Sequence, residues 1–567
     1  MRKVVQSFWF LLLIFTANLS FAQISPPIPS DNLRTIQIIS GDLLSEKQID
    51  SVTKIETITG NVVLHEGTTK FYCDRAVINR RLNTMEAFGN VRINQGDSVF
   101  TSSQYIKYLG NERVAYLKRN VRLTDKNSTL TTPELEYNLT TGIAKYNNGG
   151  RVVNGKTVLT STQGVYYEDT KDVYFIKKVD VVDPRTKIKA DSLLYNTFTQ
   201  KLTFIGPTYI KNKDGDIFTT QGSYDLKNGD AFFGNRSLVK DSSGRVYQAN
   251  ILVFDDKSGQ VQMEGVAIIK DTTNRFIITG NQIFLNRKNN SFLATTKPVL
   301  IIWQDKDTTY VTGDTLFSGF TKKVYSDDIV SERRLVTGID SSKNILQNKD
   351  SSKLIINSPT VVSKSKINNA NRAGDKDNAS IRYFLAYHHV RIFNDSMQAV
   401  SDSLFYSGAD STFRLFYDPV IWSGNNQITG DTIFLYTKNK KMDRVHVFEN
   451  GLMANKINSE FYNQVAGKTI NGYFKNGIAD YMRVKGSPAE SIYYVQDKDS
   501  AFTGMNRADG SVIDMYFIKQ QLNTVKFLND VHGKLYPIRQ IPQDQKFLKK
   551  FTWQEKRRPK NKLELFE

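Results

Sequence analysis

A motif that returns at a nearly fixed interval constrains the fold of this chain more than any other feature. Residues 60–64 (GNVVL) are followed by residues 89–93 (GNVRI) and 119–123 (RNVRL), so the starts lie 29 and 30 residues apart. A period of this size is typical of repeat architectures, in which one supersecondary unit is stacked many times. The sequence therefore predicts a repeat array that grows along one axis.

The repeating unit has the pattern of β-strands. Each motif copy alternates apolar and polar residues, which is the two-residue period of a strand. A second piece of the unit is polar and then apolar or aromatic, as in residues 402–406 (DSLFY) and 431–435 (DTIFL). No segment shows the sustained apolar period near 3.6 that marks a helix. We therefore expect an all-β chain with a repeat of about 30 residues, in which each Gly-Asn pair opens a turn.

The ends and the middle of the chain depart from the repeat. Arg2 and Lys3 precede a short apolar run and a small-residue cleavage site at Ala22, which predicts a signal peptide and export, with an N-terminal membrane anchor as the alternative. The predicted division is: 1–22 signal peptide, 23–35 flexible lead, 36–320 first repeat array, 321–379 polar insertion or linker, 380–540 second repeat array, and 541–567 basic tail.

Charge and cysteine content restrict the partners and the chemistry. The formal net charge is +19, and an exported basic protein is expected to meet phosphorylated lipids or acidic glycans rather than nucleic acid. A basic surface that only keeps the protein soluble is the alternative. Cys73 is the only cysteine, so an intramolecular disulfide and a thiolate metal cluster are both excluded.

The strand motifs resemble those of a known family. Residues 189–196 (KADSLLYN) and 312–317 (TGDTLF), with the recurring Gly-Asn-Val opening and a closing aromatic-Gly, are similar to the OstA-like (organic solvent tolerance-like) family. That family includes periplasmic lipopolysaccharide-transport bridge proteins and the N-terminal periplasmic domain of the outer-membrane lipopolysaccharide translocon. The resemblance covers about residues 36–320 and 380–540. It implies an elongated β-jellyroll, an open trough of stacked antiparallel strands whose apolar interior holds acyl chains.

This resemblance implies a non-enzymatic lipid carrier or bridge in lipopolysaccharide transport and outer-membrane assembly. The expected partners are lipopolysaccharide or a related phosphorylated glycolipid, and envelope transport proteins of the same jellyroll that pair edge to edge. The expected location is the periplasm, with peripheral contact to the outer membrane left open. The candidate lipid contacts are the inward apolar residues Val62, Leu64, Val91, Ile93, Val121, Leu123, Leu193, Ile283, Leu316, Leu404 and Ile433.

A structural or adhesive β-solenoid with a filled interior is the alternative function, because alternation buries the same residues in an open trough and in a closed core. Residues 150–157 (GRVVNGKT) match the spacing of a phosphate-binding P-loop, but a strand-like run follows where that motif needs a helix. The sequence therefore predicts no nucleotide site.

Residues suited to metal binding or catalysis are present but wrongly arranged. The five histidines lack ligand spacing, and adjacent His388 and His389 are expected on opposite sides of a strand. Asp314, Asp402 and Asp431 recur at one place in the unit, which is typical of structural residues and not of a glycosidase pair. We expect no catalytic residue, metal or cofactor, and we regard a carbohydrate-active β-helix enzyme as the weakest alternative.

Overall fold

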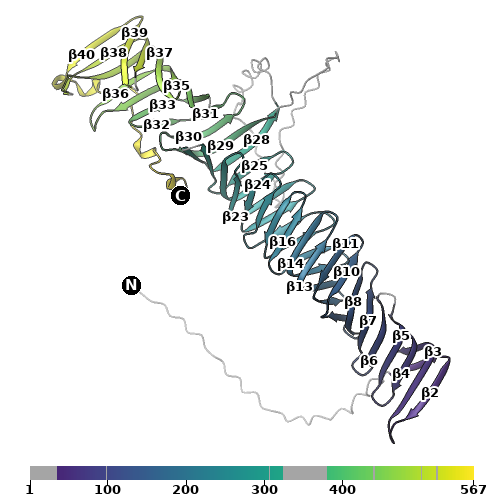
Figure 1. Ribbon diagram of the computed structural model, residues 1–567. Helices are drawn as coiled ribbons and strands as arrows, with labels where there is room; N and C mark the ends of the chain where they lie inside the picture. Colours follow the sequence, from purple (N-terminus) through teal and green to yellow (C-terminus); the bar gives the residue numbers. More distant parts are fainter. Residues whose placement is uncertain are drawn as a thin grey trace, which may run out of the picture. The chain divides into compact units, whose positions relative to one another are not determined.

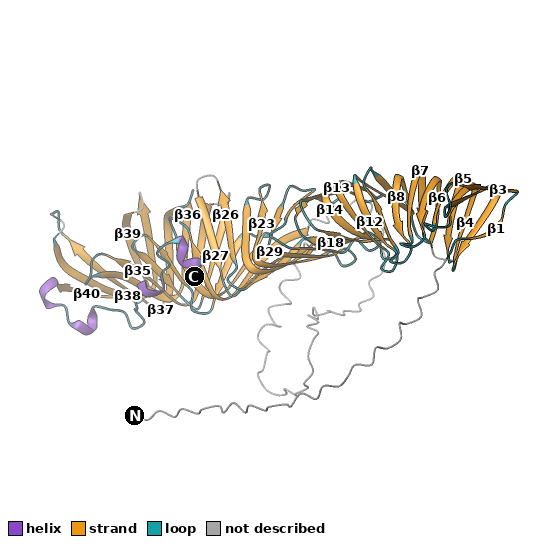
Figure 2. Ribbon diagram, turned by 90° about the horizontal axis from the view of Figure 1, so that it is seen from below, coloured by secondary structure: helices purple, strands orange, loops and turns teal. Residues whose placement is uncertain are grey.

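The computed structural model describes residues 35–96, 99–304, 307–322, 380–438, 441–499, 501–518 and 521–566 (Figure 1). The expected signal peptide, the flexible lead up to residue 34 and the polar insertion from residue 323 to 379 lie outside these residues. Within the described ranges the chain forms strands and four short 3-10 helices, as Figure 2 shows. The predicted all-β fold of stacked antiparallel strands is confirmed.

The chain divides into two units by its internal contacts, residues 1–155 with 160–173, and residues 156–159 with 174–567. The division passes through β11 (Thr157–Ser161) and β13 (Asp172–Val182). The other strands of the first unit are β1 (Gln37–Ser40), β2 (Leu43–Gln48), β3 (Lys54–Glu66), β4 (Thr69–Asn79), β5 (Thr84–Gln95), β6 (Val99–Leu109), β7 (Val114–Thr124), β8 (Thr129–Asn138), β9 (Ile143–Tyr146), β10 (Gly150–Asn154) and β12 (Gln163–Tyr167).

The second unit contains many short strands and several long ones. Those before the insertion are β14 (Thr186–Asn196), β15 (Lys201–Phe204), β16 (Thr208–Asn212), β17 (Gly215–Thr219), β18 (Gly222–Asp225), β19 (Ala231–Phe233), β20 (Leu238–Asp241), β21 (Val246–Gln248), β22 (Ile251–Asp255), β23 (Gln260–Asp271), β24 (Phe276–Asn286), β25 (Ser291–Thr295), β26 (Val299–Gln304), β27 (Asp307–Thr312) and β28 (Thr315–Lys322). Those after it are β29 (Ser380–Phe393), β30 (Gln398–Ser407), β31 (Thr412–Phe416), β32 (Val420–Ser423), β33 (Asn426–Thr429), β34 (Thr432–Lys438), β35 (Lys441–Lys456), β36 (Tyr462–Lys475), β37 (Ile478–Gln496), β38 (Phe502–Ile518), β39 (Gln521–Leu528) and β40 (His532–Pro537).

Each long strand bends in its middle at two residues that we call the corner. The pairing of β3 with β4 skips from Thr59 to Val62, and the skipped Gly60 and Asn61 have φ angles of 80° and 45°. Two left-handed residues inserted into an antiparallel ladder form a bulge that turns the strand sharply. Similar left-handed pairs recur at Gly89-Asn90, Arg119-Asn120, Lys177-Lys178, Asn235-Arg236, Gly265-Val266, Thr296-Lys297, His388-His389, Tyr417-Asp418 and Glu449-Asn450.

The corner corrects the expectation that Gly-Asn opens a turn. The pair lies inside β3 and joins two strand-like pieces into one bent strand, so the repeat motif marks a bend and not a chain reversal. An aspartate on the neighbouring strand supports it, because the side-chain amide of Asn90 donates to Asp74 at 2.9 Å and that of Asn450 donates to Asp431 at 2.9 Å. The recurring aspartates are therefore structural residues.

Because every long strand bends, its two halves belong to two different ladders. In the second unit, residues 193–195 of β14 pair with β15, whereas residues 186–190 pair with β16. We call the ladder that contains β15, β18, β19, β22, β25, β28, β31, β34 and β39 ladder X, and the ladder that contains β16, β17, β20, β21, β26, β27, β32, β33 and β40 ladder Y. In the first unit, the half of β3 before the corner corresponds to ladder X and the half after it to ladder Y.

The core lies between the two ladders of each unit. In the second unit Phe204 and Phe233 face inward from ladder X, and Ile210 and Ile278 face inward from ladder Y, all at most 2% exposed. Alternate residues of the same strands are exposed, as the period of a strand requires. Burial of these rows between the ladders is the main source of stability, at roughly 25 cal/mol per Å² of apolar surface.

The residues expected as a basic tail form an ordered segment. After β40 come η1 (Ile538–Gln540), η2 (Gln543–Gln545), η3 (Glu555–Arg557) and η4 (Lys562–Leu565). We call residues 541–566 the strap. It runs back along the second unit, so that Glu564 meets Arg391 of β29 and the C-terminus lies far from β40 in Figure 1.

We predict that Gly89→Ala destabilises the protein more than Gly96→Ala. Both glycines have left-handed φ angles, 70° and 66°, and each substitution incurs a backbone penalty of about 1–2 kcal/mol. Only at Gly89 would the added Cβ also collide with the carboxylate of Asp74, whereas the space beside Gly96 is open. Urea-unfolding midpoints of the two variants measure the difference, and equal shifts would show that the corner is not sterically constrained.

A buried ion pair across β37 and β38 predicts a pH dependence of stability. The Arg483 guanidinium donates two hydrogen bonds of 2.7 Å to Asp514, which is 3% exposed, and Tyr481 donates a third of 2.7 Å. These bonds, led by those from Arg483, outweigh burial and hold the pKa of Asp514 below its usual value. Asp514 therefore stabilises the fold above its unfolded pKa, and this contribution is lost as the pH falls through its folded pKa.

Asp514→Asn is accordingly expected to lower the free energy of unfolding at pH 7 by about 1–2 kcal/mol. The difference in free energy of unfolding between the variant and the unmodified protein should become smaller as the pH falls below about 4. Unfolding curves at several pH values test this, with exposed Glu112→Gln as the control for loss of a negative charge. A difference that stays constant with pH would contradict the role assigned to Asp514.

Candidate functional site

The five candidate residues of the second unit lie in a single row across ladder X. Leu193 pairs with Phe204, and each cross-strand partner leads to the next until the row reaches Ile513. The row passes in order through Leu193, Phe204, Gly222, Phe233, Leu252, Met263, Ile283, Ala294, Leu316, Ala386, Leu404, Leu415, Ile433, Val447, Ile470, Val484 and Ile513. The five candidates are each at most 1% exposed.

The six candidates of the first unit lie directly after the corners. Leu64, Ile93 and Leu123 belong to one row that also contains Phe71 and Thr101. Val62, Val91 and Val121 are the next inward positions toward the corner, and all six candidates are at most 2% exposed. The sequence motif therefore selects equivalent interior positions in successive repeats.

The sequence reasoning missed the row members that lie on the strands between the motif copies. Phe204, Phe233 and Met263 occupy the same row but belong to strands whose motif differs. The alternation of apolar and polar residues within these strands was the sequence feature that indicates their inward orientation. Phe284 has the opposite orientation to its neighbour Ile283 and is 39% exposed, so not every aromatic residue of the repeat faces inward.

Hydrogen bonds and ion pairs between polar side chains join the edge of ladder X to the edge of ladder Y, at the strand ends far from the corners. We call this set of bonds the seam. In the first unit Glu66 is fully buried, accepts a hydrogen bond from Tyr108 and lies 3.5 Å from the guanidinium of Arg113. Tyr166 donates to Asp125 at 3.0 Å. These partners are 41 to 47 residues apart in the sequence, so the bonds close the side of the unit opposite the corners.

The seam continues in the second unit with arginine as the main bridging residue. Arg185 donates to the carbonyl oxygens of Leu226 and Lys227. Arg287 lies 3.5 Å from Asp214 and 3.3 Å from Asp256. Because charge-assisted bonds are directional and stronger than neutral ones, they hold the two ladder edges together more firmly than packing alone.

A cavity of about 480 Å³ opens on the seam of the second unit. Its apolar wall includes Ile217, Phe233 and Val239, which face the space between the ladders. Basic side chains stand at its rim, among them Lys213, Arg245, Arg287 and Lys288. Asp214, Asp241 and Asp256 line the same cavity and pair with Arg287 and Arg245, so its charged lining is mixed and two of its cations already have carboxylate partners.

The seam groups have displaced pKa values that keep their bonds intact near neutral pH. Burial raises the pKa of Tyr108, Tyr166 and Tyr247, and a hydrogen-bonded carboxylate beside each ring adds to the shift. Burial also acts to raise the pKa of Asp241, but hydrogen bonds from Ser243 and Tyr247 and the charge of Arg245 lower it overall. The tyrosines therefore remain neutral donors and Asp241 remains a charged acceptor.

The histidines and repeating aspartates belong to the corners and not to a catalytic site. His388 and His389 form a left-handed pair whose rings contact Asp402 and Asp314 at 3.0 Å, and both side chains are exposed, which corrects the expectation of opposite strand faces. The hydrogen bond that the His388 ring donates to the Asp402 carboxylate raises the pKa of His388. Among the described residues, no group of three His, Cys, Asp or Glu side chains is placed to hold a metal ion.

The P-loop-like segment is a hairpin. Residues 150–157 form β10, a turn and the start of β11, so no helix N-terminus faces a phosphate here. The structure therefore agrees with rejection of a nucleotide site at this position.

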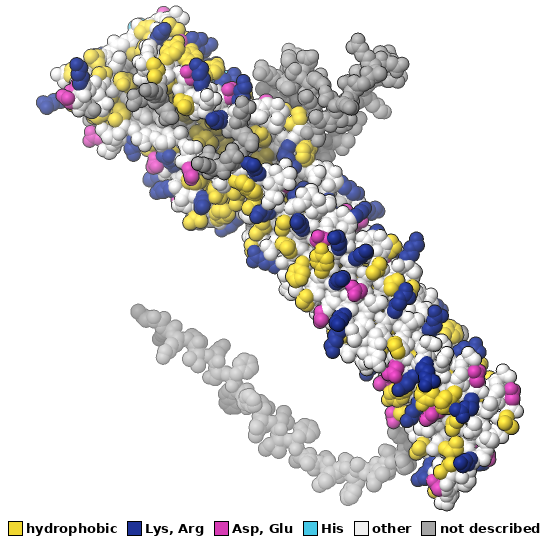
Figure 3. Space-filling model, viewed as in Figure 1, with side chains coloured by type: hydrophobic (Ala, Val, Ile, Leu, Met, Phe, Trp, Pro, Cys, Tyr) yellow, Lys and Arg dark blue, Asp and Glu magenta, His cyan; other side chains and the backbone are white. Residues whose placement is uncertain are grey.

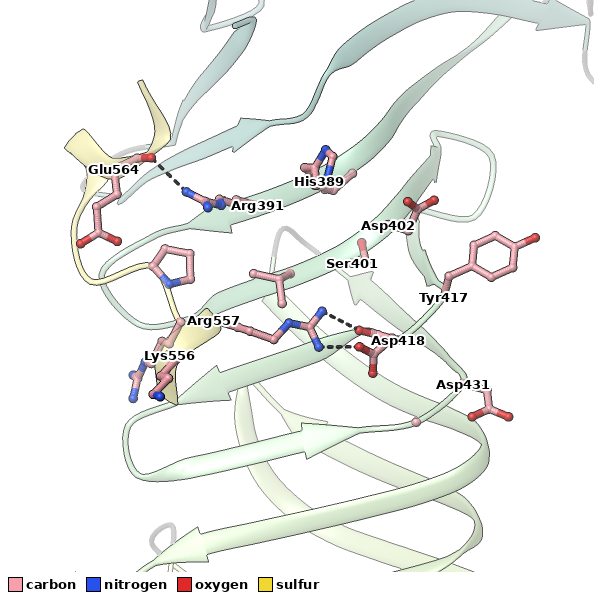
Figure 4. Close-up of a pocket in the computed structure, with 15 residues that line it drawn as sticks. His389, Arg391, Ser401, Asp402, Tyr417, Asp418, Asp431, Lys556, Arg557 and Glu564 are labelled. Atoms are coloured by element: carbon pink, nitrogen blue, oxygen red, sulfur yellow. Dashed lines mark hydrogen bonds and ion pairs between the residues drawn. The ribbon is translucent and has the colours of Figure 1, made fainter. Parts of the chain in front are cut away.

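A second pocket, of about 990 Å³, lies between the strap and β29–β32 (Figure 4). Arg557 of the strap binds Asp418 at 2.6 Å, and Arg391 donates to the carbonyl oxygen of Glu564 at 3.3 Å. Neither this pocket nor the seam cavity is lined by any of the eleven candidate residues. The candidates contact other core side chains in the described form.

A protein-family model and several solved structures match this chain. The model of the OstA-like protein family matches residues 34–191. A solved structure, LptH from Pseudomonas aeruginosa, is described as the LptA homologous periplasmic component of the conserved lipopolysaccharide transport device. It is 16% identical, covers 31% of this chain and 84% of its own, and has a TM-score of 0.09. At this score the likeness says nothing further about the fold.

No curated protein matches the chain. In the part of the chain that the structure describes, no helix has the length and apolar character needed to cross a membrane. The family match begins near the first strand and ends within β14, inside the range over which the repeats predict the resemblance. Residues 34–191 thus match the OstA-like family model, in the part of the chain where the repeat motifs predict the resemblance.

Proposed function

We propose that this chain is a non-enzymatic carrier or bridge for lipid in the periplasm, acting in lipopolysaccharide transport and outer-membrane assembly. The observation that carries the proposal is the unbroken apolar row from Leu193 to Ile513, in a chain whose residues 34–191 match the OstA-like family. A row of this kind offers an environment without polar side chains at every repeat. It is therefore suited to an elongated apolar ligand and not to a single reacting group.

Acyl chains would lie between the ladders, against the inward residues of successive strands. Each buried methylene contributes about 0.8 kcal/mol. Because neighbouring positions such as Leu404, Leu415 and Ile433 have nearly the same size and polarity, movement from one repeat to the next meets no large change in energy. Transport of this type forms and breaks no covalent bond, so catalytic residues are not required.

Acyl chains can reach the rows only if the seam parts. In the described form the candidate residues are covered, and the bonds of Glu66, Arg113 and Arg185 cross the edge. The cavity lined by Arg245 and Arg287 lies on this edge, where Asp241, Asp214 and Asp256 pair with these two arginines. We propose that acyl chains insert there while the cations at the rim bind the lipid phosphates.

The ends of the two units would dock onto other envelope proteins of the same jellyroll. β2 pairs with β3 on one side, and its Leu43 and Leu44 are 64% and 51% exposed. β40 pairs with β38, and its Leu535 is 66% exposed. Unpaired strand edges with exposed apolar side chains favour addition of a partner strand.

The alternative is a structural or adhesive β-solenoid that binds partners on its outer face. The close packing of the eleven candidates favours this function, because a solenoid of this type needs a filled interior. Basic side chains spread over the face seen in Figure 3, with acidic ones among them, would then serve contacts with the envelope surface. The two functions differ in whether lipid ever touches the inward rows.

We predict that photo-crosslinkers at Ile93 and Leu193 capture lipopolysaccharide in living cells. Both positions face the space between ladders and are at most 2% exposed. The matched control is Phe284, which belongs to the same kind of repeat but is 39% exposed on the opposite face. Adducts are detected by immunoblotting for lipopolysaccharide after ultraviolet irradiation. No adduct at either inward position, or an equal yield at Phe284, would favour the solenoid alternative.

We also predict that Arg245→Gln combined with Arg287→Gln lowers the adduct yield at Leu193. Removing both cations from the cavity rim takes away charge-assisted contacts to lipid phosphate, each worth about 1.5–3 kcal/mol when fully made. A loss of roughly tenfold is expected. Exposed Lys189→Gln is the control for loss of positive charge on the outer surface. An unchanged yield in the double variant would exclude this rim as the place of lipid insertion.

A further inference from the structure

The strap covers the outer face of ladder Y. Ile392 and Ile421 face the core, whereas Val400, Val420 and Trp422 stand on the opposite face of the same strands and are also at most 6% exposed. On most strands of this repeat the outer face meets solvent. Here it is buried because residues 546–565 lie across it.

The contact follows a single row of ladder Y. Successive cross-strand partners on the outer face are Gln398, Trp422, Gln427, Ala454, Gln464, Ile492 and Arg507. The three glutamines of this row are 6%, 0% and 3% exposed. A long polar side chain is rarely this buried unless its amide is fully hydrogen-bonded.

Two of these glutamines bind the backbone of the strap at two points each. Gln464 donates to the carbonyl oxygen of Lys546 at 3.0 Å and accepts from the N–H of Leu548 at 2.9 Å. Gln427 donates to the carbonyl oxygen of Thr552 and accepts from the N–H of Gln554, both at 2.7 Å. Each side-chain amide thus replaces the backbone partner that a neighbouring strand would supply.

Gln427 is held in the orientation that this contact requires. The indole N–H of Trp422 donates to the same Gln427 oxygen at 3.1 Å, so the oxygen and the nitrogen of the amide have defined positions. Gln427 and Gln464 lie two strands apart, about 10 Å at the usual strand spacing. Between these two contact points the strap forms a turn, in which the N–H of Phe551 donates to the carbonyl oxygen of Leu548 at 2.9 Å. Gln464 therefore holds the peptide on one side of this turn, and Gln427 holds it on the other side.

The ends of the contact are fixed by arginines. Arg558 of the strap donates two hydrogen bonds, of 2.9 and 2.7 Å, to the side-chain oxygen of Gln398. Arg507 of β38 donates to the carbonyl oxygen of Gln545 at 3.2 Å. Between them, Leu548 is 3% exposed and joins a cluster with Ile492 and Met505.

We propose that the outer face of ladder Y between Gln398 and Arg507 is a peptide-binding groove, and that its resident ligand is the strap of the same chain. Within the described residues the strap contributes no strand, and side-chain amides provide its main contacts to the ladder. It is therefore held as a bound peptide is held. The ligand class is a basic peptide with a turn between its two backbone contact points, bound also through the guanidinium groups of Arg557 and Arg558.

This groove is independent of the proposed lipid function, because it lies on the face opposite the inward rows. Bound there, the strap links strands from β29 to β38 and shields Trp422 and Val420 from solvent. Side chains of the strap add to this recognition, because Leu548 is buried beside Ile492 and the rings of Phe551 and Trp553 lie within 5.4 Å of the Tyr462 ring. A second peptide that carries these side chains and an arginine at the position of Arg558 can therefore replace the strap without disturbing the ladders.

The test uses the full chain with a site-specific protease sequence inserted between the exposed residues Pro542 and Gln543. After cleavage, we expect the fragment that begins at Gln543 to stay bound during gel filtration. A fluorescent synthetic peptide of residues 543–566 should then exchange with it, as followed by fluorescence anisotropy. Gln427→Leu combined with Gln464→Leu should weaken peptide binding by about tenfold to a hundredfold, because four backbone groups lose their partners.

The control is Gln248→Leu, the same substitution on the outer face of ladder Y at a position away from the strap. Circular dichroism establishes that each variant is folded. A peptide carrying Arg558→Ala tests the guanidinium contact without any change to the groove, and it should bind about tenfold more weakly. Release of the fragment from the cleaved chain, unchanged binding by the double variant, or exchange only on unfolding would each overturn the proposal.

Discussion

The corner is the constraint on which the rest of the structure depends. A strand that stayed straight would place its apolar residues on one flat sheet, with no second layer to cover them. Two left-handed residues at the bend of several strands, such as Gly60 and Asn61 in β3, send the strand's halves into two ladders that cover one another. The repeat supplies its own second layer in this way. The aspartates and histidines beside the corners, which could be mistaken for catalytic groups, stabilise this bend.

The seam favours a closed edge between the ladders, whereas lipid binding by the inward rows requires that edge to open. Burial of Leu193 and Ile283 is favourable whether side chains or acyl chains fill the space between ladders. A lipid carrier must also let its edge open, which exposes buried groups such as Glu66 and breaks charge-assisted bonds. Bridges made by a few polar side chains suit this compromise better than continuous strand pairing, because they can part locally while the ladders stay intact.

The outer face of ladder Y shows that the two faces of one strand can serve different partners. Ile421 faces the core, and its neighbours Val420 and Trp422 face the strap. Two buried glutamines, Gln427 and Gln464, bind the backbone of the strap, and Gln398 binds the Arg558 guanidinium, since an unpaired amide would be costly there. The strap therefore covers apolar surface that would otherwise be open to association with other molecules.

Local pattern determined much of this protein from the sequence alone. The 29-to-30-residue period, the strand alternation and the inward positions such as Leu64 and Leu404 follow from residue chemistry at short range, and the buried rows contain them. The Gly-Asn pair predicts a turn, although it forms a bend, because Gly and Asn supply left-handed residues equally well in turns and in bends. The seam, the 480 Å³ cavity and the contact of Gln427 with Thr552 were decided only by the tertiary structure. These features join residues from 31 to 125 positions apart, and no local pattern records which distant groups the stacking of strands brings together.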